Sequence, residues 1–106
     1  MAAEAILKNN YLCQINSNHL YFTSKATNRN YVEAHHIIPI STQALFHNGI
    51  DCVPNIASLC PTCHRQIHYG LDNDREEMLE ILWDNNYRDI ERVGIELKFE
   101  ELLQMY

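Results

Sequence analysis

The stretch Cys60-Pro61-Thr62-Cys63-His64-Arg65-Gln66-Ile67-His68 carries two thiols and two imidazoles within nine residues. Cys60 and Cys63 have the spacing at which two thiolates close a knuckle on one tetrahedral Zn²⁺. His64 and His68 are four residues apart, so on a helix they share a face, with Cβ atoms about 5–6 Å apart. The stretch therefore predicts a zinc knuckle that leads into a short helix, and it can supply ligands to two different metal sites.

Two short strands are predicted upstream of this stretch. Residues 31–38 are rich in β-branched and aromatic side chains and end at Pro39, and residues 55–59 form a second, shorter segment of this kind. The residues between them form a long loop bounded by prolines at both ends. We therefore expect an α+β fold in which two strands precede a helix over about residues 62–69, stopped by Gly70 in the position that glycine favours.

Helices are also predicted at the two ends of the chain. Residues 2–10 are rich in helix formers, whereas residues 11–30 are polar and form a loop that a metal would hold. A third helix begins near Asp72 and breaks near Asn85-Asn86, and the apolar spacing over residues 99–106 predicts a closing helix. We expect a single domain over residues 1–106, with a core at about 11–70 and a helical C-terminal appendage at about 72–106.

The charge of the chain is unevenly distributed. The formal net charge is −6, but residues 1–71 carry four basic and three acidic residues, and residues 72–106 carry four basic and eleven acidic ones. All six histidines lie in the first part. The acidity of the chain argues against a free-standing DNA-binding protein, yet it belongs to the C-terminal part and says little against a polyanion at the histidines.

The composition also indicates where the chain works. No apolar run is long enough to span a membrane and the N-terminus lacks the features of a signal peptide, so we expect a cytoplasmic protein with no membrane partner. In that compartment four cysteines favour zinc ligands or buried thiols over disulfides. Cys13 is the expected third zinc ligand, with His19 as the fourth and Cys52 as the alternative.

Three segments follow one another in the order strand, loop, strand, helix: Glu33-Ala34-His35-His36-Ile37-Ile38-Pro39, then Asn55-Ile56-Ala57-Ser58-Leu59, and the knuckle segment. This order resembles the HNH nuclease family and its ββα-metal fold. The resemblance runs from about Cys13 to Tyr69, and its subgroup is the zinc-containing HNH domains of restriction and phage-defence nucleases. That subgroup commonly has a second Cys-x-x-Cys at Cys13, from which this chain departs, because position 16 is Asn.

The resemblance implies roles for individual residues in an endonuclease that hydrolyses DNA. His36 matches the general base that activates water, and Asn55 matches the residue that orients this base. His35, His64 and His68 match the ligands of one catalytic divalent ion, for which Mg²⁺, Mn²⁺, Ni²⁺ and Zn²⁺ all remain open. A structural zinc at the thiols is implied as well. Arg65 is a candidate for binding a phosphate oxygen.

One property of strands conflicts with this assignment. Consecutive residues of a regular strand point to opposite faces, so His35 and His36 should not both reach one metal centre. A bulge or the strand end near Pro39 would allow both histidines to reach the metal centre. If the strand is regular, we expect only His36 to belong to this centre.

Two other functions are compatible with some of the same residues. A zinc-stabilised module that binds nucleic acid or protein would need no catalytic ion, and a nuclease acting on RNA would use the same residues. The weak charge implies targeting by another domain or subunit, for which residues 72–106 are a candidate docking surface. The sequence leaves open base-modification preference, oligomeric state including a homodimer, and whether these residues are a whole protein or a part of one.

Overall fold

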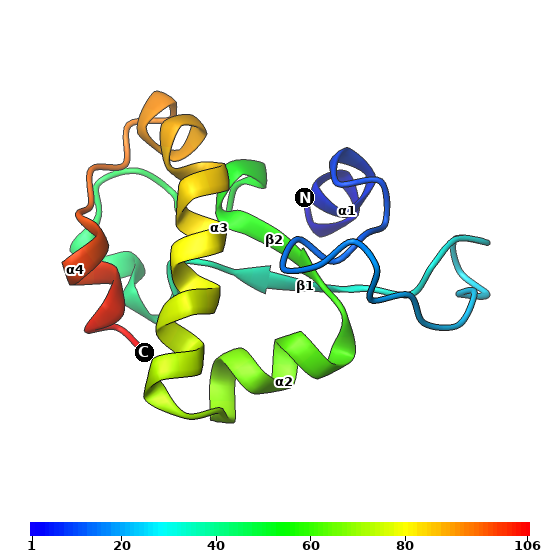
Figure 1. Cartoon of the computed structure of the whole chain (residues 1–106). Coiled ribbons are helices and arrows are strands. Elements are labelled where there is room, and N and C mark those ends of the chain that lie inside the picture. Colours follow the sequence, from blue (N-terminus) through cyan, green and yellow to red (C-terminus); the bar gives the residue numbers. More distant parts are fainter.

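A computed structural model describes the whole chain, residues 1–106. Four helices and one two-stranded antiparallel sheet account for its regular structure, together with two 3₁₀ turns in the loop between the strands (Figure 1). In chain order the elements are α1 (Ala2–Lys8), β1 (Glu33–His36), the turns Ile40–Leu45 and Val53–Asn55, β2 (Ile56–Leu59), α2 (Pro61–Tyr69), α3 (Asp72–Arg92) and α4 (Phe99–Leu103). The predicted α+β class and ββα core are confirmed.

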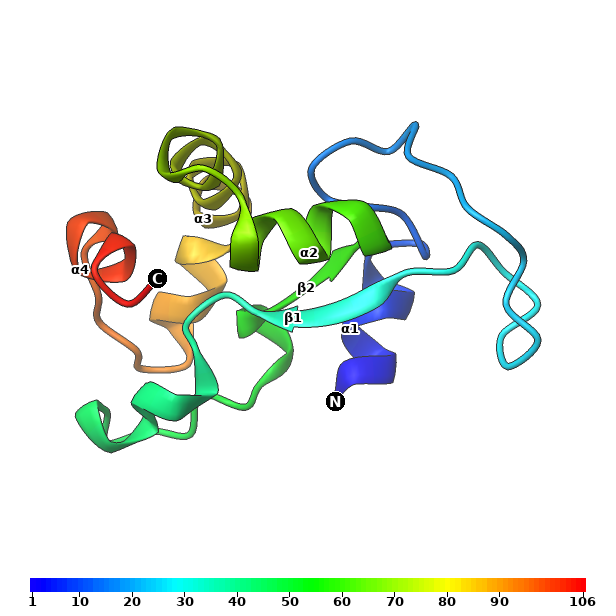
Figure 2. The same cartoon turned by 90° about the horizontal axis from the view of Figure 1, so that it is seen from below.

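The two strands form a hairpin in which Glu33 lies opposite Leu59 and His36 lies opposite Ile56. All four residues of β2 are buried, because α1 covers one face of the hairpin and α2 covers the other (Figures 1 and 2). Both strands are shorter than predicted, since pairing stops where the chain turns into the long loop. The histidines at the end of β1 are therefore held directly against α2.

The helix α2 begins at the zinc-knuckle sequence. Pro61 occupies its first turn, where a missing backbone N–H costs nothing, and the Cys60 sulfur accepts a hydrogen bond from the Cys63 N–H at 3.3 Å. Ile67 is fully buried, which fixes the helix face that turns toward the hairpin. The helix ends as predicted before Gly70, but Gly70 has φ −73° and ψ 177°, so it continues in an extended conformation rather than the left-handed one.

The helix α3 is continuous over Asp72–Arg92, so the predicted break at Asn85-Asn86 is wrong. Asn86 is buried and donates from its side chain to the Leu82 carbonyl at 2.7 Å, which satisfies its amide without opening the helix. The chain reverses instead at Gly94, with φ 85°, where an added Cβ would lie 2.1 Å from the Asn48 side chain. The closing helix α4 covers only five residues.

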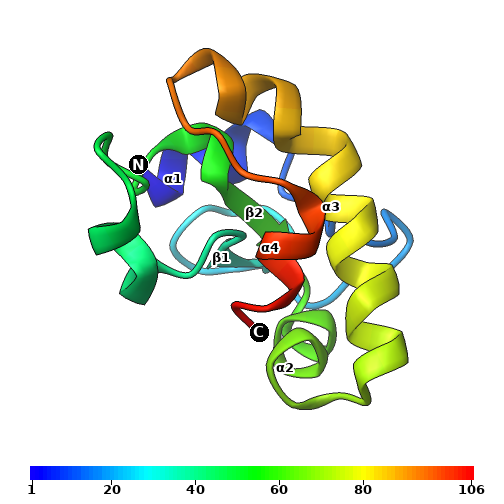
Figure 3. The same ribbon diagram turned by 90° about the vertical axis from the view of Figure 1, so that its left-hand side faces the viewer.

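The C-terminal helices share the hydrophobic core of the ββα unit. Met78, Leu79 and Leu82 of α3 and Leu102 of α4 are buried in the same cluster as Ile37 and Ile67, and Figure 3 shows α4 and the C-terminus lying beside α2 and α3. Most of the apolar stripe predicted over residues 72–106 is thus buried within the domain. None of the helices combines the length and the hydrophobicity needed to cross a bilayer.

Candidate metal centres and active site

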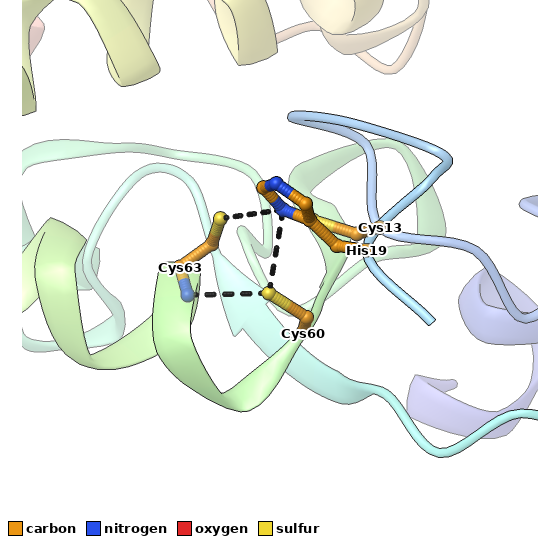
Figure 4. Close-up of side chains that lie close together, drawn as sticks. All are labelled: Cys13, His19, Cys60 and Cys63. Atoms are coloured by element: carbon orange, nitrogen blue, oxygen red, sulfur yellow. Dashed lines mark hydrogen bonds between the residues drawn. The ribbon is translucent and has the colours of Figure 1, made fainter. Parts of the chain in front are cut away.

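Three thiols and one imidazole converge where the N-terminal loop meets the start of α2. The ligand atoms of Cys13, His19, Cys60 and Cys63 all lie within 4.8 Å of one another (Figure 4). The Nδ1 atom of His19 is 3.4 Å from the Cys63 sulfur and 3.7 Å from the Cys60 sulfur. Four such donors around one point are the number and the type that a structural metal site requires.

The surroundings of these thiols suit metal ligation. Cys13, Cys60 and Cys63 are all buried. Burial works against ionisation of Cys13, but backbone N–H groups of Cys60, Asn16 and Ile15 outweigh it and lower the pKa of this thiol. Burial and the neighbouring thiols Cys60 and Cys13 raise the pKa of Cys63.

The structure brings His19, and not Cys52, to this cluster. Cys52 is a free, partly buried thiol beside the turn Val53–Asn55, and burial raises its pKa. The alternative fourth ligand named from the sequence is therefore not near the other three. The cluster joins the loop before β1 to the junction of β2 and α2, two segments that are distant in sequence.

A second cluster consists of His35 from β1 with His64 and His68 from α2. Their candidate ligand nitrogens also lie within 4.8 Å of one another, and the ring centroids are separated by 5.0 to 5.3 Å. His35 is 4% exposed, and burial, followed by the charges of His64 and His68, lowers its pKa to about 3. His35 is therefore neutral at ordinary pH, which is the form that binds a metal.

These three histidines and His36 line one cavity of about 450 Å³. His35 points toward α2, whereas the His36 side chain is one third exposed and bonds through Nε2 to the Asp51 carboxylate at 2.8 Å. Both rings line this cavity, although they come from consecutive residues at the end of β1. For a regular strand, only His36 is expected to belong to the metal centre, but the structure places His35 with His64 and His68.

Hydrogen bonds to the cluster leave one nitrogen free on two of the rings. The Glu33 carboxylate lies 2.9 Å from His64 Nδ1, so this nitrogen donates and Nε2 keeps its lone pair. The Tyr106 hydroxyl donates to the Ile37 carbonyl at 2.5 Å and lies 2.7 Å from His35 Nε2. When the hydroxyl accepts from that nitrogen, His35 Nδ1 is left as the metal-binding atom.

Glu33 is held in its charged form by these contacts. Its carboxylate accepts hydrogen bonds from His64 and from the Tyr31 hydroxyl, and these bonds lower the pKa of Glu33. A carboxylate that accepts from a ligating histidine fixes the orientation of the ring and increases its basicity as a ligand.

Asn55 lies outside the cavity. Its side chain is fully buried, accepts from the Ile38 N–H at 2.8 Å, and donates to the carbonyls of Ile38 and Ile50. Its own carbonyl accepts from the Ile37 N–H at 2.9 Å. Asn55 therefore fixes the backbone just after His36 and has no direct contact with the imidazole.

The cationic side chain in the cavity is Arg75 of α3, whereas Arg65 is exposed on α2 and does not line it. Arg75 donates to the Ile67 carbonyl at 3.0 Å, and its guanidinium lies 5.9 Å from the centre of the Tyr106 ring. Sequence reasoning missed Arg75, Tyr106, Glu33 and Asp51. Of these four, only Glu33 could have been recognised as a site residue from the sequence, because it lies two residues before His35 and therefore on the same face of a strand.

The donor sets fit two different metals. Three thiolates and one imidazole suit a closed structural site. Three imidazoles in an open cavity suit a borderline cation such as Mn²⁺, Ni²⁺ or Zn²⁺ better than Mg²⁺, which prefers oxygen. A divalent ion bound there would supply charge stabilisation at a phosphate oxygen.

Comparison with known proteins agrees with this geometry. Residues 21–70 match the model of the HNH endonuclease family, a range that contains both strands, the long loop and α2. The chain is also 40% identical over 55 residues to the type IV methyl-directed restriction enzyme EcoKMcrA of Escherichia coli strain K12. That alignment covers 52% of this chain but 17% of the relative. The match to the HNH endonuclease family thus covers residues 21–70, just under half of the chain.

Proposed function

We propose that this chain is the nuclease domain of a restriction-type enzyme and that it hydrolyses phosphodiester bonds of DNA with a divalent metal. The observation that carries the proposal is the cavity in which His36 lies beside the three clustered histidines. This cavity brings together a candidate base and a candidate metal site, which is what hydrolysis of a phosphodiester requires. The family match supports this chemistry, and the restriction relative supports DNA as the substrate.

His36 acts as the general base. Asp51 accepts a hydrogen bond from Nε2–H of His36 at 2.8 Å, which leaves Nδ1 free to take a proton from the attacking water. The same carboxylate would stabilise the imidazolium that forms, as an acidic partner does for a catalytic histidine elsewhere. Asn55 contributes indirectly, because its buried side chain holds the backbone at residue 38 and so the end of β1.

His35, His64 and His68 hold the catalytic divalent ion, and Glu33 and Tyr106 orient two of these rings. Zn²⁺ is the metal we propose for the thiol cluster, since a closed set of three thiolates and one imidazole is the typical ligand set of structural zinc. That ion would be structural, because its four ligands leave no position for substrate.

Targeting is proposed to come from elsewhere. The relative is a methyl-directed restriction enzyme and this chain spans only 17% of its length, so a separate domain or subunit would choose the DNA site. Residues 72–106 remain a candidate surface for it through their exposed acidic face, since the apolar side is buried in the domain.

Cleavage of supercoiled plasmid tests the proposal. The purified chain is assayed with Mg²⁺, Mn²⁺ or Ni²⁺ and with a chelator, beside His36→Ala and the matched control His47→Ala, whose histidine is exposed in the long loop. Loss of a general base lowers the rate by about 10²–10⁴-fold, so His36→Ala should be nearly inactive while His47→Ala cleaves normally.

Circular dichroism and zinc content establish that both variants are folded. Full cleavage by a folded His36→Ala protein would remove His36 as the base. No cleavage by the wild type with any of these metals, together with one bound metal per chain, would favour the non-catalytic zinc module instead.

A further inference from the structure

The loop before β1 contains a projecting segment, residues 17–31, which we call the arm. It extends away from the helices and the hairpin in two perpendicular views (Figures 1 and 2). Its tip is closed by a bridge between Thr23 and Asn30 and by a hydrogen bond from Ser24 N–H to the Arg29 carbonyl at 2.7 Å. The backbone of the arm therefore forms a defined turn.

The arm exposes three large side chains, two of them apolar and one a tyrosine. Leu20 is 64% exposed, Phe22 is 61% exposed and Tyr21 is 41% exposed. The Phe22 ring is stacked on Tyr31, with ring centroids 4.7 Å apart and an interplanar angle of 18°. Three consecutive exposed large side chains on a projecting turn are typical of a binding surface.

The charge of the arm identifies the kind of partner. The chain has a net charge of −6, yet residues 5–32 contain no acidic residue, and the arm itself carries Lys25 and Arg29. Neither cation forms an ion pair with a carboxylate, and the Arg29 guanidinium lies 4.7 Å over the Tyr11 ring. Unpaired cations interleaved with exposed aromatic rings suit a phosphate backbone and the apolar faces of sugars and bases.

The arm is also continuous with the candidate active site. The Tyr31 hydroxyl donates to Glu33 at 2.8 Å, and Glu33 in turn bonds His64 at 2.9 Å. Tyr21 bonds the side chain of Thr62 in the first turn of α2, the helix that carries His64 and His68. A polymer whose phosphate occupied the cavity would pass close to the base of the arm.

We propose that the arm is a second DNA-contacting element, which binds the DNA flanking the phosphate that is cut. Lys25 and Arg29 contact backbone phosphates, and Leu20 and Phe22 pack against sugars or base edges. This proposal rests on the proposed nuclease function for its choice of DNA. It explains how an acidic chain can hold a polyanion at its histidine cavity.

Two assays separate DNA binding from chemistry. Fluorescence anisotropy with a labelled DNA duplex measures affinity in a His36→Ala background, where cleavage is suppressed. Hydrolysis of bis(4-nitrophenyl) phosphate, with His36 intact, measures chemistry on a diester too small to reach the arm. The arm variants are Lys25→Glu, Leu20→Ala and Phe22→Ala. The controls are Arg88→Glu, at an exposed position of α3, and Leu7→Ala, whose side chain is 59% exposed on α1.

We expect Phe22→Ala to weaken duplex binding roughly tenfold, as loss of one stacking contact does. Leu20→Ala should weaken binding by a smaller factor. Lys25→Glu should weaken binding as well, and it should reduce the slope of log K against log salt concentration by about one. The two control variants should bind as the wild type does, and all five should hydrolyse the small diester at the wild-type rate.

Equal duplex affinity of the arm variants and the wild type would overturn the proposal. Equal weakening by Lys25→Glu and Arg88→Glu would overturn it too, because net charge alone would then account for the effect. Failure of the wild type to hydrolyse either substrate would count against the nuclease function, whereas the anisotropy comparison would still decide the role of the arm.

Discussion

Asn55 combines a position typical of the family motif with an environment typical of a structural residue. Its buried side chain satisfies three backbone groups of the long loop, at Ile38 and Ile50. The amide cannot reach substrate in the cavity, because the residue is fully buried and does not line it. At the scale of one residue, Asn55 therefore holds the backbone next to the strand end that carries His36.

Asn55→Ala should accordingly destabilise the domain by about 3 kcal/mol or more, because each unpaired buried backbone group costs about 1–3 kcal/mol. Urea unfolding of the metal-loaded protein measures this loss, and Asn73→Ala, at an exposed position of α3, is the control. A variant with wild-type stability and a large loss of cleavage rate would instead give Asn55 a direct catalytic role.

Glu33 is a second residue whose effect passes through a neighbour. Its carboxylate accepts the hydrogen bond of His64 Nδ1 at 2.9 Å and so leaves the lone pair of Nε2 free. Glu33→Ala should weaken Mn²⁺ or Ni²⁺ binding at the three histidines about 10–100-fold. Isothermal titration of the zinc-loaded protein measures this affinity, with Glu80→Ala on the exposed side of α3 as the control. Unchanged affinity would show that Glu33 does not orient the ligand.

The knuckle at the start of α2 matters at the scale of elements. It joins the loop of residues 11–30, which has little regular structure, to the hairpin and to α2. An ion at such a site contributes about 10–16 kcal/mol in small zinc domains, which is comparable to the whole stability of a domain, about 5–15 kcal/mol. The order of this loop and of the arm that it carries therefore depends on the thiol cluster.

Cys60→Ala or removal of the metal by a chelator should thus unfold the chain, whereas Cys52→Ala should remain folded and keep the knuckle metal. Circular dichroism and metal analysis after gel filtration measure both properties. His19→Cys should also keep the metal, because a thiolate replaces the imidazole in a tetrahedral site. A folded, metal-free Cys60→Ala protein would contradict the structural role of the cluster.

At the scale of the whole molecule, the acidic residues lie mainly on the outer surface of α3 and α4. Four cations lie elsewhere or at the cavity: Lys25 and Arg29 are on the arm, Arg65 is exposed on α2, and Arg75 lines the cavity. Each neutralised phosphate contributes about −0.9 to the slope of log K against log salt. Duplex binding by this chain should therefore be weak, with a slope between about −2 and −4. Anisotropy titrations at several salt concentrations measure it, and a slope near zero would exclude phosphate contacts at these cations.

The same helices complete the cavity. Arg75 and Tyr106 form part of its wall, and Leu102 anchors α4 in the common core. The C-terminal part therefore belongs structurally to the candidate active site, although the sequence suggested an appendage beside it.

The sequence by itself determined the elements that depend on local spacing. Cys60 and Cys63 fixed the knuckle, His64 and His68 fixed one face of α2, and the β-branched runs predicted the hairpin, because these patterns act over a few residues. The same reasoning failed at Asn85-Asn86, where burial of one amide against Leu82 overrides a weak local preference for a break.

The tertiary structure alone decided which distant groups meet. His35 joins His64 and His68 because β1 packs against α2. Tyr106 bonds His35 across 71 positions of the sequence, and Arg75 enters the cavity from α3. No local pattern encodes such contacts, since they follow from the burial of α3 and α4 in one core with the hairpin.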